Sequence, residues 1–473
     1  MVTWHRDTLL DQHQALADGR VSPEELLEYY LERIERFNPD VHALVHLDPD
    51  AARSAAHEAT RRIAVGNATP LTGLPTADKD LVARAGMPTR YGSAVTAGAP
   101  TAEASDPMAL WLDQVGAVSV GKTTTSEFGM AAATEALAVG PTRNPHDLTR
   151  SAGGSSGGAA AAVAAGMLPY APGSDGGGSI RIPALSCGLV GWKPSRGLIP
   201  AGSGFEFLGG LAVPGLITRS VADLALAADL MVEGSWGWAT RAPGRPGGYF
   251  DQVSSPRPPA RIGLTTATPW PAEWGIAPSD DALVALDAAK QALVEAGHEV
   301  VEFDWSPTPS YADDFVTLWT ANAAALPVPP EQVSQLEPLT QFLIERGQQV
   351  SAVELVRALG GLRRFEFDTI TAFSSFDAVL TPGLSSVAPE IGWYDQGDAW
   401  RNFRQQVEIT PWTSFVNVAG LPAIAVPTHY AGDLPLGVQL IGRAGGDGTI
   451  IGLAADIERQ LPGATRWPAM VTD

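Results

Sequence analysis

The sequence predicts an α/β protein: a single large domain with an extended mixed β-sheet flanked by helices on both faces. Segments with the two-residue period of strands alternate with segments of helical period along the 473 residues, without an internal repeat. No convincing linker divides the chain, so one domain is expected. Hydrophobic residues make up 45% of the sequence, which is enough for a large core.

Each element is expected from its local pattern. The clearest helix start is Ser22-Pro23-Glu24-Glu25, which offers an N-cap, a first-turn proline and a glutamate at the third position. Other helices are expected over residues 8–18, 50–65, 107–116, 159–165, 220–232, 280–296, 305–345 (broken at 327–330), 351–373 and 449–460. Strands are expected over residues 41–47, 73–80, 117–120, 261–264, 298–303, 377–381, 423–427 and 437–441, and a surface loop over 236–259.

Composition argues against several classes of protein. The net charge of −21 disfavours nucleic acid or an anionic membrane as a partner, because phosphate binding needs clustered Lys and Arg. No run of eighteen apolar residues and no signal-peptide pattern occurs, so we expect no membrane span and a cytoplasmic protein. The one cysteine, Cys187, lies in an apolar segment and is expected to be buried. No HExxH or CxxC pattern occurs, so no metal or other cofactor is expected.

Two turns rich in glycine and serine occur within residues 150–196. They cover residues 153–158 and 173–179, and the Ala-rich run 159–165 lies between them. Glycines let backbone N–H groups approach a ligand closely, and three of them lead into Ser179. A hydroxyl beside such amides is what acyl transfer needs. A flexible linker is the alternative, but apolar segments flank the turns.

Lys79 is a candidate base. If residues 73–80 form a strand, its side chain points away from those of Asp78 and Asp80, because side chains alternate along a strand. Burial apart from these carboxylates would lower the pKa of Lys79 and let it accept a proton near neutral pH. From spacing alone, an exposed lysine at a strand end is the commoner outcome.

A nucleotide-binding pattern occurs at residues 116–123, which match GxxxxGK[ST]. In a P-loop the strand precedes the pattern, whereas here the four central residues are themselves expected to form the strand. Lys122 is then more simply a loop lysine. A nucleotide-binding or non-catalytic protein therefore remains only as an alternative from another class.

A nucleophile-elbow pattern, GxSxG, occurs at residues 153–157. An elbow needs a strand just before it and an Asp and a His after it. Residues 144–150 do not look like a strand, and the only histidines downstream are His298 and His429. The elbow is kept as a minor rival mechanism.

Several motifs together resemble the amidase signature family, in the family's order and over nearly the whole chain. The longest is SDGGGSIRIPALSCGLVGWKPSRG at 174–197, which follows GGSSGG at 153–158. The others are GLPTADKD at 73–80, YGS at 91–93, GAVSVGKTTTSEFGM at 116–130, GPTRNP at 140–145, FVNVAGLPAIAVP at 415–427 and PLGVQLIG at 435–442. This combination is far more specific than any single motif.

The resemblance implies the amidase signature fold and a Ser–Ser–Lys catalytic triad. Ser179 would be the nucleophile, Lys79 the base, and Ser155 the bridging acid and base, following a cis peptide bond from Gly154. Asp175 would brace the loop together with a second charged residue, Arg181. The oxyanion would be held by backbone N–H groups of Gly176, Gly177, Gly178 and Ser179.

The resemblance also divides the chain by role. The parts would be an N-terminal helical segment (1–70), the catalytic core (71–200), a variable region that builds the substrate pocket (201–415) and the C-terminal part of the core (416–473). Aromatic residues from loops of the variable region, including 392–415, would supply an apolar pocket, with ordinary core packing as an equal alternative. The expected pocket residues are Met130, Gly153, Gly154, Phe205, Trp412 and Phe415.

The implied function is hydrolysis of small amides by a stand-alone bacterial amidase, similar to those that act on nylon-type oligomers and urethanes. Aryl or alkyl amides, esters and carbamates would be substrates, and the protein would be a monomer or homodimer without nucleic acid or membrane partners. The alternative is the glutaminase component of the glutamine-dependent tRNA amidotransferase. That protein would need partner subunits and a polar glutamine pocket.

Overall fold

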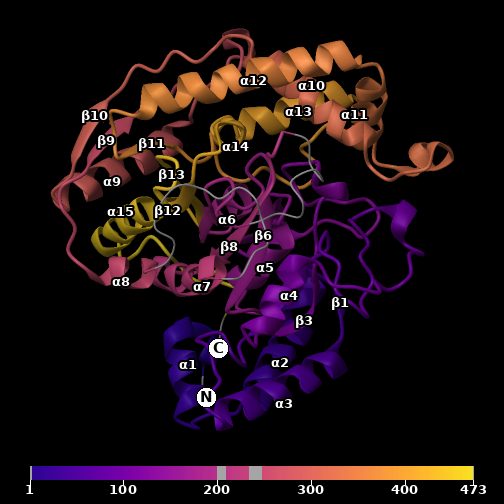
Figure 1. Ribbon diagram of the computed structural model, residues 1–473, viewed down its shortest axis with the longest axis vertical. Coiled ribbons are helices and arrows are strands. Elements are labelled where there is room, and N and C mark those ends of the chain that lie inside the picture. Colours follow the sequence, from indigo (N-terminus) through magenta and orange to yellow (C-terminus); the bar gives the residue numbers. More distant parts are fainter. Residues whose placement is uncertain (1–2, 200–208, 234–247, 472–473) are drawn as a thin grey trace.

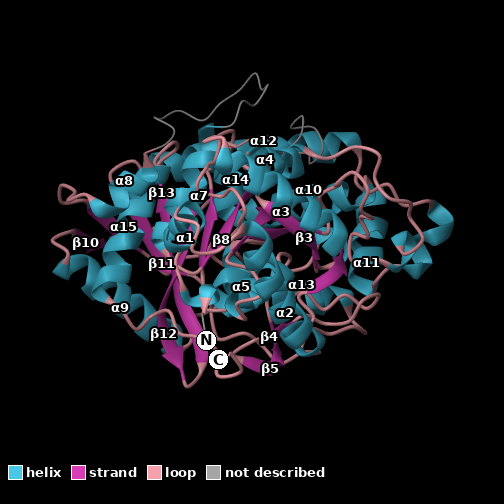
Figure 2. Cartoon of the chain, turned by 90° about the horizontal axis from the view of Figure 1, so that it is seen from below, coloured by secondary structure: helices cyan, strands magenta, loops and turns pink. Residues whose placement is uncertain are grey.

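Strands run through the interior of the molecule and helices cover them on both sides (Figures 1 and 2). The computed structural model describes residues 3–199, 209–233 and 248–471. The main sheet has eight strands in the order β10-β9-β11-β13-β12-β7-β8-β6. They are β6 (Tyr170–Asp175), β7 (Val190–Lys193), β8 (Val213–Thr218), β9 (Arg261–Leu264), β10 (Glu299–Glu302), β11 (Ala378–Pro382), β12 (Ala423–Ala431) and β13 (Leu434–Gly442). Because β9 pairs in parallel with β10 and β11 while the other pairs are antiparallel, the sheet is mixed, as predicted.

A smaller sheet carries the first part of the site. Its strands, in the order β1-β3-β2, are β1 (Leu44–Leu47), β3 (Val118–Thr123) and β2 (Pro75–Lys79). Its edge strand β2 lies beside β6, the edge of the main sheet, where Thr76 Oγ1 donates to the carbonyl of Tyr170 at 3.2 Å. The expected single sheet is therefore two adjoining sheets. A hairpin of β4 (Arg143–Asn144) and β5 (Asp147–Ser151) forms a separate two-stranded sheet.

The helices form covering layers around these sheets, with α1–α3 at one end of the molecule and α10–α13 at the other (Figure 1). The α-helices are α1 (Leu9–Ala17), α2 (Pro23–Val41), α3 (Pro49–Ala64), α4 (Pro107–Gln114), α5 (Gly157–Ala164), α6 (Arg181–Ser186), α7 (Val221–Glu233), α8 (Tyr249–Ser254), α9 (Asp280–Glu295), α10 (Tyr311–Ala324), α11 (Pro338–Gln348), α12 (Ala352–Phe373), α13 (Ala399–Ile409), α14 (Ser414–Ala419) and α15 (Asp447–Gln460). Short 3₁₀ helices are η1 (Trp4–Arg6), η2 (Ala94–Thr96), η3 (Glu127–Gly129), η4 (Ala272–Trp274) and η5 (Pro330–Gln335).

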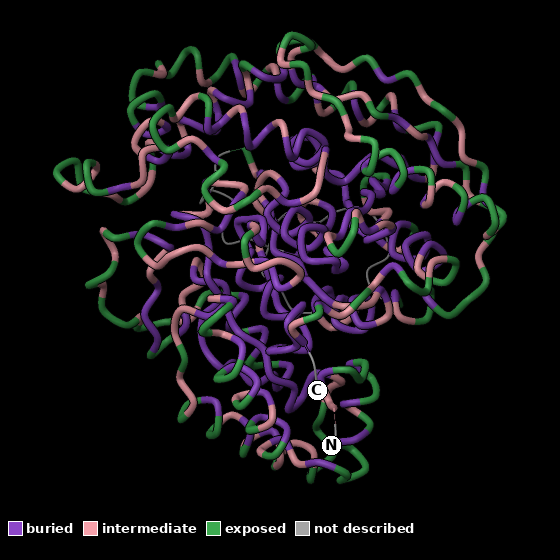
Figure 3. Tube along the Cα trace, turned by 180° about the vertical axis from the view of Figure 1, so that it is seen from behind, coloured by how far each residue is buried: buried purple, intermediate pink, exposed green. Residues whose placement is uncertain are grey.

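Side chains of the main sheet alternate between two cores, as the period of two requires. Val438 and Leu440 of β13 belong to a core that includes Ile450 of α15, whereas Ile441 of the same strand joins an aromatic core with Phe373 of α12. Buried residues accordingly occupy the middle of the molecule (Figure 3). This two-sided burial explains why the central strands are apolar runs in the sequence.

Most elements with strong local signals are confirmed. At the start of α2, Ser22 Oγ accepts from the Glu25 N–H at 3.1 Å and the Glu25 carboxylate accepts from the Ser22 N–H at 2.8 Å, which is the predicted capping box. Some boundaries were wrong. The helix expected from residue 305 starts only at Tyr311, as α10, and the strand expected from residue 41 starts only at Leu44, as β1, because Val41 ends α2. His42 between them adopts a left-handed conformation (φ 57°) that ends the helix.

Four regions differ from the prediction because tertiary contacts override local composition. Residues 144–150 were not expected to be a strand, yet β5 forms there by pairing with β4. Helix α8 lies within the expected loop 236–259, and α13 lies within the expected loop 392–415. The strand β6 has the sequence YAPGSD, which is turn-like in composition, but it forms a full ladder with β8.

Candidate active site

Lys79 ends strand β2 and is buried. Its Nζ donates to Ser155 Oγ at 2.8 Å and to Ser174 Oγ at 3.1 Å. Burial lowers the pKa of Lys79 to about 7, although the nearby carboxylate of Asp175 opposes this shift. A large fraction of this lysine is therefore the neutral amine near neutral pH, and its predicted burial is confirmed.

The carboxylates that flank Lys79 in sequence have other partners. Asp78 Oδ2 accepts from Arg84 Nε at 2.5 Å, and Asp80 Oδ1 accepts from the Arg90 N–H at 3.0 Å. Burial raises the pKa of Asp80 to about 6. The alternation expected for a strand thus separates Lys79 from both neighbours.

Ser155 lies in the turn between β5 and α5, directly after a cis peptide bond from Gly154, as the resemblance implied. Gly154 packs on the chain at Ala133, where an added Cβ would lie 2.7 Å from a backbone atom, so no larger residue fits. The next N–H, that of Ser156, donates to the carbonyl of Ser179 at 3.1 Å. This hydrogen bond joins the two glycine-rich turns.

Ser179 lies in the turn between β6 and α6 and is 9% exposed. The N–H of Gly178 in the same turn donates to Asp175 Oδ1 at 2.7 Å, so this amide is already occupied. Among the described residues, the N–H groups of Gly176, Gly177 and Ser179 have no hydrogen-bond partner. Three of the four amides predicted to bind an oxyanion are therefore free to do so.

Asp175 and Arg181 form a fully buried ion pair beneath this turn. Arg181 Nη2 donates to Asp175 Oδ1 at 2.8 Å and Nε donates to Oδ2 at 2.9 Å. Burial alone would raise the pKa of Asp175, but Arg181 holds it well below its usual range. Asn417 of α14 completes the network, since its Nδ2 donates to the carbonyl of Asp175 at 2.8 Å. The ion pair is therefore buried beneath the turn, which is where a residue pair that braces the loop would lie.

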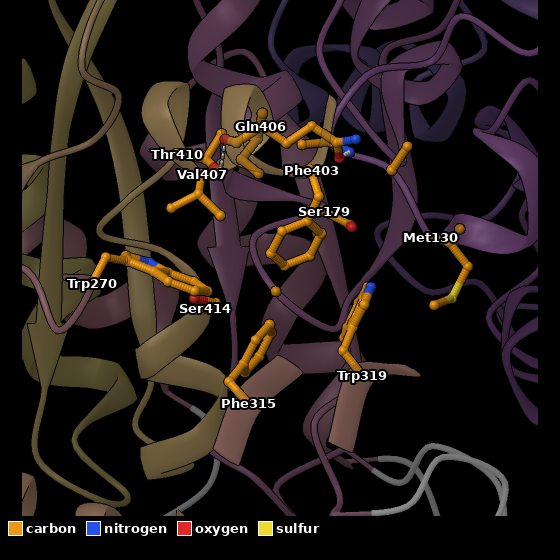
Figure 4. A pocket seen from close by; sticks show the side chains of 15 residues that line it. Met130, Ser179, Trp270, Phe315, Trp319, Phe403, Gln406, Val407, Thr410 and Ser414 are labelled. Atoms are coloured by element: carbon orange, nitrogen blue, oxygen red, sulfur yellow. Dashed lines mark hydrogen bonds between the residues drawn. The ribbon is translucent and has the colours of Figure 1, made fainter. Parts of the chain in front are cut away.

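A pocket opens beside Ser179, and the empty space in and around its mouth amounts to about 490 Å³. Aromatic rings from three separate segments surround it: Trp270 follows β9, Phe315 and Trp319 lie on α10, and Phe403 lies on α13 (Figure 4). The remaining lining residues are Gly129, Met130, Ala131, Ala132, Gly177, Ile182, Gln406, Val407, Thr410 and Ser414. No charged side chain is among these described lining residues.

The expected pocket residues are divided between the pocket and the core. Met130 lines the pocket. Gly153 and Gly154 lie outside the lining, in the turn before Ser155. Trp412 and Phe415 are fully buried: Trp412 Nε1 donates to the carbonyl of Thr266, and Phe415 packs against the ring of Trp305. Phe205 lies outside the described residues. The sequence did not predict five other residues of the pocket wall: Trp270, Phe315, Trp319, Phe403 and Gln406. Of these, Phe315 and Trp319 have the (i, i+4) spacing of one helix face.

The P-loop pattern does not form a phosphate cradle. Lys122 was expected in a loop, but it lies in β3, is fully buried and donates from Nζ to the carbonyl of Val82. The backbone of this segment is paired with β1 and β2, so its N–H groups take part in the hydrogen bonding of the sheet.

The elbow pattern has its strand, β5, but not its histidine. Ser155 Oγ accepts from Lys79, whereas His298 Nε2 contacts Asp456 at 3.0 Å and His429 Nε2 contacts Asp281 at 3.3 Å. Lysine is therefore the base candidate beside this serine.

The sequence also led to expectations about Cys187, metal ions and membrane spans. Cys187 is buried as predicted, and burial raises the pKa of its thiol. In the ranges that the structure describes, no group of three or more His, Cys, Asp or Glu side chains could hold a metal ion. None of the described helices is long and apolar enough to cross a membrane.

Comparison with known proteins agrees with this fold. A family model described as Amidase matches residues 25–451. The Mycobacterium tuberculosis protein named "Putative amidase AmiB2" is 37% identical over 470 residues, which is 97% of each chain. A solved 6-aminohexanoate cyclic dimer hydrolase has a TM-score of 0.89 at 28% identity, over 99% of this chain and 100% of that one. A bacterial aryl acylamidase of the amidase signature family has a TM-score of 0.84 at 25% identity, over 96% of each chain.

These likenesses, taken with the site, define an enzyme that hydrolyses carbon–nitrogen bonds of amides. The chain belongs to the amidase signature family. A solved component of the glutamyl-tRNA(Gln) amidotransferase from Thermotoga maritima shares the fold less closely, with a TM-score of 0.77 at 27% identity over 99% of this chain and 98% of that one.

Proposed function

We propose that this amidase cleaves small uncharged amides through an acyl-enzyme on Ser179, with Lys79 as the base and Ser155 as the bridge between them. The observation that carries the proposal is the 2.8 Å hydrogen bond between the buried Lys79 Nζ and Ser155 Oγ, next to the Ser179 turn. A base with a pKa of about 7 is suited to proton transfer at neutral pH.

Acylation begins when neutral Lys79 accepts the proton of Ser155 while Ser155 accepts that of Ser179. The oxygen of Ser179 bonds to the carbonyl carbon, and the carbonyl oxygen becomes an oxyanion. The free N–H groups of Gly176 and Gly177, with that of Ser179, are the donors for this charge. Loss of one such donor costs on the order of 3 kcal/mol of transition-state stabilisation.

Breakdown of this intermediate returns the proton. Ser155 donates to the leaving nitrogen and is reprotonated by Lys79, so the carbon–nitrogen bond breaks and a neutral amine departs. A water molecule then attacks the acyl-enzyme, giving its proton to the same relay. Release of the carboxylic acid restores Ser179, and the reaction is balanced without a cofactor.

The pocket supports neutral substrates with aryl or alkyl groups. Its aromatic wall offers apolar area, and no charged side chain among the described lining residues would pair with a charged substrate. Esters and carbamates fit the same proposal because they pass through the same acyl-enzyme step. The similar proteins named above as a 6-aminohexanoate cyclic dimer hydrolase and an aryl acylamidase point the same way.

Glutamine hydrolysis, as in the glutaminase component of the tRNA amidotransferase, is the less favoured alternative. Glutamine carries an ammonium and a carboxylate, and binding both normally requires charged or strongly polar partners. We expect the purified chain to show negligible glutaminase activity. Robust ammonia release from glutamine would reverse this preference.

Active-site labelling tests the proposal. A fluorophosphonate should form an adduct on Ser179, located by peptide mass spectrometry, and the adduct should be greatly reduced in Lys79→Ala and Ser155→Ala. An adduct on Ser155 that is unaffected by Lys79→Ala would contradict the proposal and favour an elbow-type serine. Anilides, esters and carbamates would then be assayed with the wild type and the three alanine variants.

A further inference from the structure

Thr413 contacts the glycine turn from a distant part of the chain. Its Oγ1 donates to the carbonyl oxygen of Gly177 at 2.6 Å, although the two residues are 236 positions apart, and its side chain is buried. We propose that Thr413 is a positioning residue for the oxyanion hole, because it orients the peptide unit between Gly177 and Gly178 and hence the amides beside it. This inference rests on the acyl-enzyme chemistry proposed above.

The peptide unit between Gly177 and Gly178 is held at both of its polar groups. Thr413 binds its carbonyl, and Asp175 Oδ1 accepts its N–H at 2.7 Å. Because a peptide unit is planar, these two bonds set the orientation of the whole unit. The flanking N–H groups of Gly177 and Ser179 then point in defined directions. Consecutive glycines do not provide this order themselves, since glycine accepts both signs of φ.

The distances around Thr413 indicate that its single hydroxyl proton is donated to the carbonyl oxygen of Gly177. Thr410 O lies at 3.0 Å from Oγ1, but Gly177 O at 2.6 Å is the closer acceptor. Thr413 also packs directly on the turn, because a Cβ added to Gly178 would lie 2.5 Å from its Oγ1. The carbonyl of Thr413 accepts from Arg181 Nη1 at 3.0 Å, so Thr413 is also hydrogen-bonded to the buried ion pair beneath the turn.

An oxyanion hole works because its donors are aligned before charge develops, so that no reorganisation is needed during the reaction. Without the Thr413 hydroxyl, the carbonyl of Gly177 loses its partner and the peptide unit gains rotational freedom. The ground-state carbonyl of the substrate depends less on these donors than the oxyanion does. The expected defect therefore falls on kcat, with little change in KM.

The test compares Thr413→Val, which removes the hydroxyl and keeps the branched shape, with Thr413→Ser, which keeps the hydroxyl. For an anilide substrate we expect T413V to lower kcat about tenfold or more, with KM within about twofold, and T413S to stay within about threefold of the wild type. The inhibition constant of a trifluoromethyl ketone, whose adduct carries the oxyanion, should rise by the same factor as kcat/KM falls.

Thr428→Val is the matched control. Thr428 is buried, and its Oγ1 donates to the carbonyl of Ala285 at 2.8 Å, away from the pocket. This variant loses a comparable hydrogen bond, so it should lower the melting temperature without lowering kcat. If T413V does not fold, Thr413→Ala removes the same hydroxyl and replaces it in the comparison.

Three results would overturn the assignment: wild-type kcat in T413V, equal loss in T413S and T413V, or an unchanged ketone inhibition constant. Failure of the underlying chemistry would look different. If the Ser179→Ala variant were active, the reaction would not require an acyl-enzyme on Ser179, and the proposed chemistry itself would be refuted. An inactive Ser179→Ala variant together with a fully active T413V would reject only the role of Thr413.

Discussion

At the scale of single residues, the protonation of Lys79 should set the pH dependence of the enzyme. The pKa of Lys79 is lowered to about 7, and only the neutral amine can accept a proton. We therefore expect kcat/KM to rise about tenfold per pH unit below pH 7 and to level off above it. The measurement is kcat/KM for a neutral anilide across a pH range that extends well to either side of this pKa.

Glu337 provides the control for this profile, because burial and the neighbouring Glu127 raise its pKa to about 7 as well. Glu337→Gln removes that titration and can retain the hydrogen bond from the Leu137 N–H to Oε1. The profile of this variant should match the wild type, whereas Lys79→Met should be inactive at every pH. A flat wild-type profile would argue against Lys79 as the base.

At the scale of elements, α13 should influence substrate preference through Phe403. This ring stacks on Trp400 at 5.5 Å and meets Trp270 at 6.3 Å, on the wall of the pocket. Phe403→Leu removes aromatic contacts worth about 0.5–1.5 kcal/mol, so the KM for an anilide should rise about twofold to tenfold. The KM for a small aliphatic amide should change little.

Phe367→Leu on α12 is the matched control for Phe403, since Phe367 is 69% exposed on the surface. It should leave both KM values unchanged. Equal effects of Phe403→Leu on the aryl and aliphatic substrates would mean that the ring supports the fold without contacting the substrate group.

Helix α5 should be intolerant of a single added methyl group. A Cβ at Gly158 would overlap the Thr124 nitrogen and the Ala43 carbonyl oxygen, both backbone atoms of neighbouring segments that cannot easily move aside. Although alanine favours helices, Gly158→Ala should lower the free energy of unfolding by about 1–3 kcal/mol. Denaturant unfolding measures the change.

Gly360→Ala on α12 should have the opposite sign, because a Cβ there meets nothing within 4 Å. In this open helix interior, the substitution should raise the free energy of unfolding by about 0.5–1 kcal/mol. If the free energy of unfolding changed in the same direction in both variants, the packing of α5 against β3 and β1 would not explain the effect of Gly158→Ala.

At the scale of the whole molecule, the two sheets should unfold together. Lys79 on β2 is hydrogen-bonded to Ser155 and Ser174, and every residue of α5, which contacts strands of both sheets, is buried. We expect one calorimetric transition, with loss of activity at the same temperature as loss of secondary structure. Two separated transitions would contradict this and would indicate that the β1-β3-β2 unit unfolds independently.

Local chemistry determined much of the architecture and the polar part of the site. Helix caps such as Ser22 and Glu25, the two-residue period of strands, and the glycine-rich turns around Ser155 and Ser179 depend on neighbours within a few positions. The same period correctly predicted that the side chain of Lys79 points away from its flanking carboxylates. The resemblance to the family indicated which residues of the two turns, Ser155 and Ser179, lie near one another.

Tertiary structure alone decided the pocket and the support of its glycine turn. Phe315 and Phe403 belong to helices far apart in sequence, and nothing local distinguishes them from Trp412, which proved to be core. Thr413 likewise reaches Gly177 only because the start of α14 lies beside the turn that follows β6. Which aromatic ring faces a cavity, and which hydroxyl meets a distant carbonyl, depends on packing between remote segments. Periodicity and turn chemistry carry no information about such contacts.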